Sequence, residues 1–147
     1  MKPRILLKHK FVDYIPETLD DLTIYISIEF ATAVHKCCCG CGHEVVTPLS
    51  PTDWKLIYNG KSISLDPSIG NWNFECQSHY LIINNQVRWA PRWTRQEIDS
   101  GRAYDLMAKE RYFNRSETSG AFADGSKDRR RKSFWQKLRK WLPLSSK

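Results

Sequence analysis

Most of the information about the fold lies in one stretch, TIYISIEFATAVHKCCCGCGHEVVTPL (Thr23–Leu49). Its first part, Thr23–Phe30, alternates apolar and polar positions and is rich in β-branched and aromatic residues, which predicts a strand. A cluster of cysteines follows, interrupted by Gly40 and Gly42, which permit backbone shapes that a side chain would forbid. The segment His43–Leu49 predicts a second strand. The stretch therefore indicates a β domain with a cysteine-rich loop between two strands.

The residues that follow continue the β pattern. The segment DWKLIYNGKSISL (Asp53–Leu65) predicts a hairpin around Asn59-Gly60, the residue pair best suited to a tight turn. Next, DPSIGN (Asp66–Asn71) has the composition of a turn. The segment FECQSHYLIINNQVRW (Phe74–Trp89) contains a strand, a turn at Asn84-Asn85 and a short return strand. The chain is therefore β-rich from Thr23 to about Trp89.

The pattern then changes to helix. Thr94 and Glu97 form a capping box that predicts a helix to about Asn114. A Gly/Ser linker, Ser116–Asp128, follows it, and a second capping box at Ser133 opens a short helix. The expected fold is α+β: a small antiparallel β domain with a zinc-ribbon-like metal site, one packed C-terminal helix and a basic amphipathic tail. The expected domains are residues 1–115 and, for the linker and tail, 116–147.

The charge is distributed unevenly. The chain of 147 residues has a net charge of +7, but residues 127–147 hold nine Lys or Arg and one Asp, and the rest is close to neutral. A globular nucleic-acid reader carries its basic patch on the folded body, which argues against nucleic acid as the partner. The sequence has no long apolar run and no signal-peptide pattern, so a cytoplasmic location is expected.

The densest chemistry is HKCCCGCGH (His35–His43). Thiolates and imidazoles in a tetrahedral array are the ligands that zinc prefers. One short loop rarely closes a tetrahedron, and CQSH (Cys76–His79) supplies a second pair with the spacing of a zinc knuckle. Clustered cysteines, odd in number, do not suit a secreted disulfide scaffold, which spreads its cysteines along the chain. The sequence therefore predicts a Zn²⁺ site.

The ligand subset stays open from spacing alone. Cys38 and Cys41 have the usual two-residue gap, whereas Cys37, Cys39 and Cys41 alternate and could share one face. Four protein ligands would make the site structural, and three ligands plus water would make it catalytic.

The catalytic alternative needs a base that takes the proton of a metal-bound water. Glu29, at the end of the first predicted strand, and Glu75, next to Cys76, are carboxylates near the cysteines in sequence. Ser78 and Ser68 could serve as nucleophile or oxyanion donor, but serine beside histidine is common by chance, and adjacent strand residues point to opposite faces.

A resemblance adds to this interpretation. Tyr25–Tyr80 resembles a bacterial family described as a domain of unknown function, whose members share the IEF-ATA-H-C-C-G-C-G opening, the VVTPL-P-DW segment, PSIGNW and the C-SHY close. The family is similar in genomic setting to bacterial ubiquitin-like conjugation systems. Cys38 falls at a position that is expected to vary. The residues on motif positions are Cys37, Cys39, Cys41, Cys76, His79, His35 and Glu29.

The resemblance implies a hydrolase that processes or releases a ubiquitin-like protein or its conjugates. We therefore expect a zinc-dependent peptidase with a metal site of Cys37, Cys39, Cys41, Cys76 and His79. The expected catalytic residues are Glu29, Ser78 and His35. The alternative is a non-catalytic zinc-ribbon adaptor in the same pathway.

The tail is interpreted from its residues alone. Phe134, Leu138, Trp141 and Leu142 form one stripe of a helix, and basic residues flank it. A basic amphipathic helix suits an anionic membrane surface or the groove of an acidic partner. Residues 130–142 are therefore predicted to bind one of these, unless the stripe packs on its own domain.

Overall fold

The computed structural model describes residues 2–119. The chain clusters into two units, Met1–Lys109 and Glu110–Lys147. All strands and the first part of the only described helix belong to the first unit. The predicted linker beyond Ser119 and the predicted amphipathic helix of residues 130–142 lie outside the described residues.

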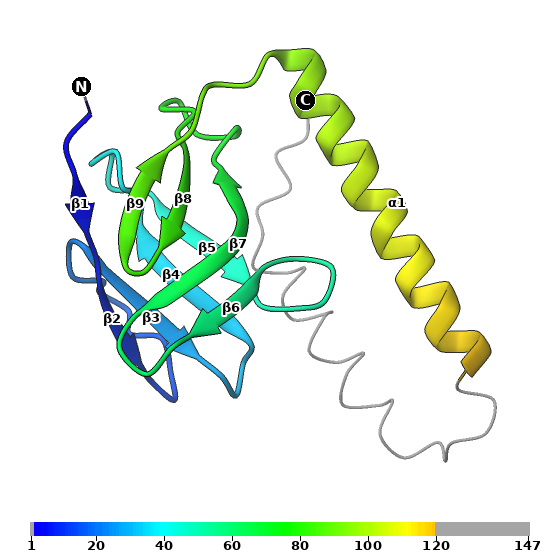
Figure 1. Cartoon of the computed structure of the whole chain (residues 1–147), viewed down its shortest axis with the longest axis horizontal. Coiled ribbons are helices and arrows are strands. Elements are labelled where there is room, and N and C mark those ends of the chain that lie inside the picture. The colour runs from blue at the N-terminus through cyan, green and yellow to red at the C-terminus, as the bar shows by residue number, and fades with distance from the viewer. Residues whose placement is uncertain (1, 120–147) are drawn as a thin grey trace. The chain divides into compact units, whose positions relative to one another are not determined.

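The first unit contains two sheets (Figure 1). The five-stranded sheet has the order β1-β9-β8-β7-β6, and the four-stranded sheet has the order β2-β3-β4-β5. All strand pairs are antiparallel except β2 with β3. The strands are β1 (Ile5–Leu6), β2 (Lys8–Phe11), β3 (Thr23–Ser27), β4 (Thr32–Lys36), β5 (Glu44–Pro48), β6 (Lys55–Tyr58), β7 (Ile63–Gly70), β8 (His79–Ile83) and β9 (Gln86–Trp89).

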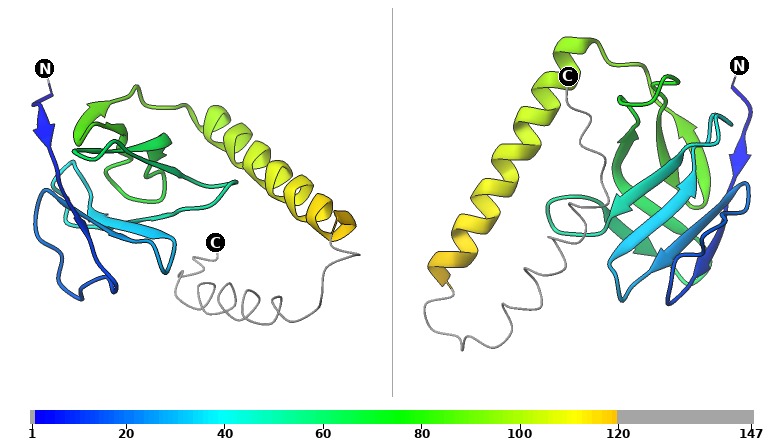
Figure 2. Two further views of the ribbon diagram at one scale, coloured as in Figure 1. Left: turned by 60° about the horizontal axis from the view of Figure 1, so that its bottom comes forward. Right: turned by 180° about the vertical axis from the view of Figure 1, so that it is seen from behind.

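The two sheets face each other across one apolar core (Figure 2). The four-stranded sheet contributes Ile24, Ile26 and Val45, among others, and the five-stranded sheet contributes Leu65 and Ile82. Successive strand residues point to opposite faces, so one apolar face of each sheet is enough to close this core. Leu7 lies buried between β1 and β2, where the chain passes from one sheet to the other.

The predicted antiparallel β domain with a C-terminal helix is confirmed. The hairpins predicted at Asn59-Gly60 and at Asn84-Asn85 join β6 to β7 and β8 to β9. The turn predicted over Asp66–Asn71 is wrong, because Asp66–Gly70 is the second half of β7. Strands β1, β2 and β4 were not predicted; the first two are short, and β4 lies in the ATAVHK segment, directly before the cysteines.

The helix α1 (Arg95–Ser119) begins at the predicted capping box. The Thr94 backbone N–H donates to Glu97 Oε2 at 2.6 Å, and the Glu97 N–H donates to Thr94 Oγ1 at 3.3 Å. These hydrogen bonds lower the pKa of Glu97, the Thr94 backbone bond most strongly. The helix continues about one turn beyond the predicted end at Asn114.

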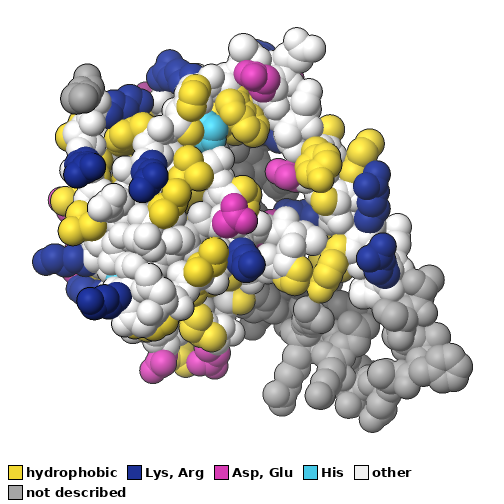
Figure 3. Space-filling model, in the orientation of Figure 1, with side chains coloured by type: hydrophobic (Ala, Val, Ile, Leu, Met, Phe, Trp, Pro, Cys, Tyr) yellow, Lys and Arg dark blue, Asp and Glu magenta, His cyan; other side chains and the backbone are white. Residues whose placement is uncertain are grey.

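The surface of this helix is unusually apolar. Tyr104, Leu106 and Met107 are 71, 60 and 54% exposed, and Figure 3 shows apolar side chains at the surface among Lys and Arg. Within the first unit, α1 contacts the β domain through polar pairs: Lys109 Nζ lies 2.7 Å from Asp53 Oδ1, and Arg102 Nη2 donates to Asn73 Oδ1 at 2.7 Å. No helix of the described part is long and apolar enough to cross a membrane.

Candidate active site and metal centre

Four cysteines meet at one end of the two sheets. Cys37 follows β4, Cys39 and Cys41 lie in the loop before β5, and Cys76 lies in the loop between β7 and β8. Their Sγ atoms all lie within 4.8 Å of one another. Three of the Sγ–Sγ distances are 3.4 Å (Cys37–Cys39), 3.9 Å (Cys37–Cys76) and 3.8 Å (Cys41–Cys76). A tetrahedron of sulfurs about 2.3 Å from a zinc ion has edges of about 3.8 Å, so the donor set fits a metal ion.

The backbone of the β4–β5 loop sets this geometry. The Cys37 N–H donates to His43 O at 2.8 Å and the Gly40 N–H donates to Cys37 O at 3.1 Å, which closes a tight turn. Gly40 and Gly42 have φ angles of +89° and +83°, which disfavour any residue with a Cβ atom. The turn brings alternate cysteines to one side.

Cys38 is the cysteine that the cluster leaves out. It is 7% exposed and belongs to the apolar core. Burial raises the pKa of its thiol to about 12, so Cys38 stays protonated and apolar in character. The structure thus brings together the alternating cysteines and separates Cys38 from them.

A layer of polar groups surrounds the sulfurs. Ser78 Oγ lies 3.1 Å from Cys37 Sγ and 3.5 Å from Cys76 Sγ, and Asn71 Nδ2 donates to Ser78 Oγ at 2.9 Å. Burial acts to raise the pKa of Cys76, but hydrogen bonds, those from Ser78 first, lower it to about 7. His43 Nδ1 lies 3.2 Å from Cys41 Sγ. Such donors stabilise thiolates and orient metal ligands.

His79 does not belong to the metal group, although the sequence suggested it as a ligand. Its Nε2 lies 2.9 Å from Ser68 Oγ and its Nδ1 lies 2.7 Å from the carbonyl oxygen of Pro91. A carbonyl can only accept, so Nδ1 carries the proton and Nε2 is free to accept the Ser68 hydroxyl proton. The three groups therefore form a serine–histidine–carbonyl chain with the polarity of a catalytic triad.

Ser68 lies on the same face of β7 as Gly70, the residue that pairs with His79. Leu65 pairs with Ile82 and Ile69 pairs with Tyr80, so three residues of β7 lie opposite the single residue Leu81 of β8. The extra residues bulge out of the ladder between Leu65 and Ile69, next to Ser68. Bulges often re-aim side chains next to active sites. The Asp66–Pro67 peptide bond within the bulge is cis.

Two tryptophans hold the imidazole of His79. The ring centroids of Trp72 and Trp93 lie 5.0 and 5.2 Å from that of His79, and the two indoles stack on each other at 5.6 Å. A Cβ atom on Gly70 would collide with the Trp72 indole, so glycine at this position lets Trp72 reach the histidine. His79 is only 5% exposed, and its ring is confined by packing as well as by hydrogen bonds.

None of the three residues predicted to be catalytic hydrogen-bonds to Ser68 or to the imidazole of His79. Glu29 is exposed in the turn that precedes β4, whereas Cys37 follows β4; the five residues of this strand separate the two by about 16 Å. His35 is fully buried and its Nε2 lies 2.8 Å from the Tyr80 hydroxyl. Burial lowers the pKa of His35 to about 4, which keeps it neutral. Ser78 contacts the sulfurs and not the imidazole of His79.

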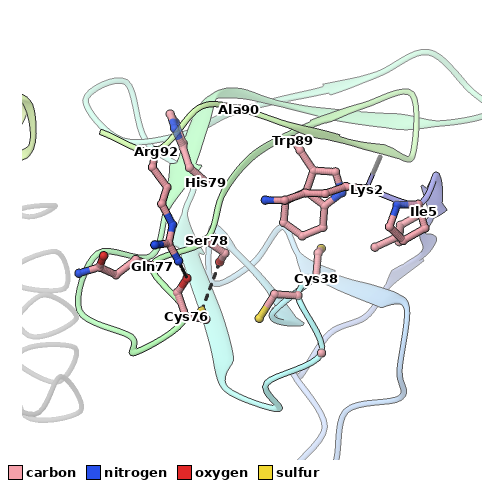
Figure 4. A pocket seen from close by; sticks show the side chains of 13 residues that line it. Lys2, Ile5, Cys38, Cys76, Gln77, Ser78, His79, Trp89, Ala90 and Arg92 are labelled. Atoms are coloured by element: carbon pink, nitrogen blue, oxygen red, sulfur yellow. Dashed lines mark hydrogen bonds between the residues drawn. The ribbon is translucent and has the colours of Figure 1, made fainter. Parts of the chain in front are cut away.

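A pocket of about 380 Å³ lies beside the cysteine loops and His79 (Figure 4). The metal loops line it through Cys38–Gly40 and Cys76–Ser78, and His79 lies in its wall. Two cations border the pocket: Lys2 Nζ lies 4.5 Å from the ring centre of Trp89, and Arg92 Nη2 donates to Cys76 O at 3.2 Å. The cysteine loops and the histidine therefore share one hollow of the surface.

The fold and site define a small two-sheet protein with a serine–histidine pair and a four-cysteine centre on neighbouring loops. The family model described as bacterial ubiquitination-like system serine protease (BubE) matches residues 11–90, more than half of the chain, and the chain belongs to this family. The match includes all four clustered cysteines, Ser68 and His79. No curated protein and no solved structure matches the chain.

This family corrects the predicted activity. A zinc-dependent peptidase was expected, but the family is described as a serine protease. The geometry agrees with this description: four sulfurs that together coordinate a metal ion would complete its tetrahedron and leave no position for a catalytic water. The expected link to a bacterial ubiquitin-like pathway is confirmed at the level of the family. Ser68 was a possible nucleophile from the sequence, but nothing local pairs it with His79, eleven residues away.

Proposed function

We propose that this protein is a serine protease of a bacterial ubiquitination-like system, with Ser68 as nucleophile and His79 as general base. The observation that carries the proposal is the continuous chain Ser68 Oγ–His79 Nε2 at 2.9 Å and His79 Nδ1–Pro91 O at 2.7 Å. A nucleophile within hydrogen-bond reach of a base, with the base oriented by a third group, is the geometric signature of covalent catalysis.

The chemistry follows from these positions. Ser68 Oγ attacks the scissile carbonyl carbon while His79 Nε2 takes the hydroxyl proton. His79 then gives the proton to the leaving amine, which leaves an acyl group on Ser68. Water, deprotonated by His79, hydrolyses this ester and regenerates the serine. The carbonyl of Pro91 keeps the imidazole in the correct tautomer throughout.

The four cysteines are proposed to bind Zn²⁺ as a structural ion. Thiolates are soft ligands that suit zinc, and the fit of the Sγ–Sγ distances supports four-coordination. The ion would cross-link the β4–β5 loop to the β7–β8 loop. Because Cys76 lies three residues before His79, such a cross-link fixes the start of the strand that carries the base.

The substrate class is proposed from the family. Proteases in ubiquitin-like systems act on a ubiquitin-like protein or its conjugates, and the family is described as part of such a system. We therefore propose a ubiquitin-like protein as the partner whose peptide or isopeptide bond is cut.

The decisive experiment is active-site labelling with a fluorophosphonate, followed by peptide mass mapping. We expect one adduct, on Ser68. Ser68→Ala should lose the adduct and reduce cleavage by roughly 10⁴-fold or more, while the chain still folds and keeps its metal content. Ser64→Ala, four residues earlier on the same strand, is the matched control and should keep both. Adduct formation on another serine, or retained cleavage in Ser68→Ala, would refute the assignment.

A further inference from the structure

The edge of β7 next to Ser68 has no neighbouring strand. On one side β7 pairs with β8 up to Gly70. On the other side β6 pairs with Ile63–Asp66 only, because its register begins at Lys55 opposite Asp66. Figure 1 shows β6 beside the first half of β7 alone. Pro67–Gly70 therefore form an open edge, hereafter the β7 edge.

The residues just before β6 explain why β6 does not continue along the second half of β7. Trp54 donates its N–H to Pro48 O at 3.1 Å, and Ser50 donates its N–H to Trp54 O at 3.2 Å. These bonds pull residues 50–54 towards the end of β5, in the other sheet. The chain that could have continued β6 along β7 is thus engaged elsewhere.

The hydrogen-bond pattern shows which main-chain groups face the opening. The Asn71 N–H donates to Ser78 O at 2.8 Å, so Asn71 and Ser78 are a hydrogen-bonded pair. Hydrogen-bonded and non-hydrogen-bonded pairs alternate in an antiparallel ladder, so Ile69 points its N–H and C=O at Tyr80. The N–H and C=O groups of Ser68 and Gly70 point away from β8, towards the open edge. Within the described residues, no strand pairs with Ser68 or Gly70 on that side of β7.

We propose that the β7 edge binds the substrate as an added β-strand, so that the protease acts on an extended, flexible segment of a protein. Two residues with free N–H and C=O groups, two positions apart, are the arrangement that strand addition uses. The proposal rests on the proposed function, because it places the scissile bond at Ser68, which lies on this same edge. A peptide whose carbonyl reaches Ser68 Oγ must run along it.

The chemistry of recognition sets the class of substrate. Main-chain hydrogen bonds hold the peptide, so binding tolerates many side chains but requires free backbone N–H and C=O groups. Such groups are free in flexible termini and linkers, whereas a folded domain has already paired them. The expected cleavage site in a ubiquitin-like protein is therefore its flexible terminus. Trp93, 40% exposed beside His79, offers an apolar contact to one side chain of the peptide.

The first experiment uses the full chain and a library of random decapeptides. Wild-type protein should cleave many of them, and Ser68→Ala should cleave none. The best-cleaved peptide is then resynthesised with a single N-methyl group on each backbone nitrogen in turn. Methylation removes one hydrogen-bond donor. We therefore expect KM to rise roughly tenfold for peptides methylated at every second residue around the cleaved bond, and to change little for peptides methylated at the residues between.

A second measurement uses hydrogen exchange by NMR on the uncleaving Ser68→Ala protein. The Gly70 amide should exchange rapidly in the free protein and become protected when the unmethylated peptide is added. The Ile69 amide, bonded to Tyr80, should be protected in both states and serves as the internal control.

The outcomes distinguish a failure of strand addition from a failure of the proposed protease function. Cleavage with a methylation scan that lacks the period of two, or a Gly70 amide that the peptide does not protect, overturns strand addition and leaves the protease intact. Labelling of Ser68 without cleavage of any decapeptide also overturns it. Failure of both labelling and cleavage refutes the proposed function itself. A Gly70 amide protected before peptide is added would show that the edge is occupied by a second copy or by residues 120–147, which overturns the inference too.

Discussion

At the residue scale, the site depends on a few buried polar side chains with paired hydrogen bonds. His79 bonds through both of its nitrogens, and Asn71 joins Ser78 to the Tyr80 hydroxyl. Tyr80 in turn lies 2.8 Å from His35. A buried group that loses its partner costs about 1–3 kcal/mol, so single changes in this network should be measurable.

Tyr80→Phe tests the network away from the catalytic pair. It leaves the Nε2 atom of buried His35 without a partner and should lower the free energy of unfolding by about 1–3 kcal/mol. Urea denaturation measures this. Tyr58→Phe is the matched control, because its exposed hydroxyl bonds only to Gly60 O, and we expect a change within about 0.5 kcal/mol. Equal effects of the two variants would contradict the role given to Tyr80.

At the element scale, two structural irregularities lie at the site. The bulge in β7 falls between Leu65 and Ile69, next to Ser68, and the β4–β5 loop folds back so that alternate cysteines converge. The helix α1 contacts the β domain through polar pairs, one of which joins Lys109 to Asp53. Asp53 is nearly buried, with 8% of its side chain exposed, and Lys109 is its cation.

Lys109→Met tests whether this ion pair attaches α1. The change leaves the Asp53 carboxylate without its cation, and we expect a loss of about 1 kcal/mol and faster amide exchange in residues 95–109. Hydrogen exchange followed by mass spectrometry measures the amide exchange rates of this segment. Arg111→Met, an exposed neighbour on the same helix, is the control and should leave exchange unchanged. Unaltered exchange in Lys109→Met would mean that other contacts hold the helix.

At the scale of the whole molecule, the four cysteines join loops from both sheets. Structural zinc contributes on the order of 10 kcal/mol to small domains, which is comparable with the total stability of a protein of this size. The folded state should therefore depend on the metal, while the chemistry at Ser68 does not involve it directly.

Cys39→Ser should remove a ligand, reduce bound zinc well below one ion per chain and lower the melting temperature by tens of degrees or prevent folding. Elemental analysis and thermal unfolding measure both effects. Cys38→Ala is the control in the same loop: it should keep stoichiometric zinc and lose only about 1–2 kcal/mol from the core. If folded wild-type protein contains no zinc, or Cys38→Ala loses it, the proposed ligand set is wrong.

The basic tail remains a prediction from sequence. We expect the full chain to co-sediment with anionic liposomes, more weakly as salt rises, because screening weakens attraction between charged surfaces. A chain that ends at Asp124 should not bind. Equal binding by both proteins would rule out a membrane role for residues 130–142, and a lower melting temperature after truncation would place the apolar stripe in the core.

Much of the fold could be predicted because its signals are local. The period-two pattern of Thr23–Phe30, the turn pairs at Asn59-Gly60 and Asn84-Asn85, and the capping box at Thr94 each act within a few residues. The cysteine cluster is also local, except for Cys76. A cluster of thiolates binds only a few kinds of metal ion, so the sequence alone indicated a metal centre.

The contact of the serine–histidine pair was decided by tertiary structure. Ser68 and His79 lie on different strands, and their contact depends on the pairing of β7 with β8, in which Gly70 lies opposite His79. A one-residue change of this register would send Ser68 to the opposite face, and no local pattern specifies the pairing. The turn-like composition of Asp66–Asn71 even predicted the wrong conformation. Residue types and their spacing therefore determined a β domain with a thiolate site, whereas strand register, a property of the assembled sheets, determined which serine meets which histidine.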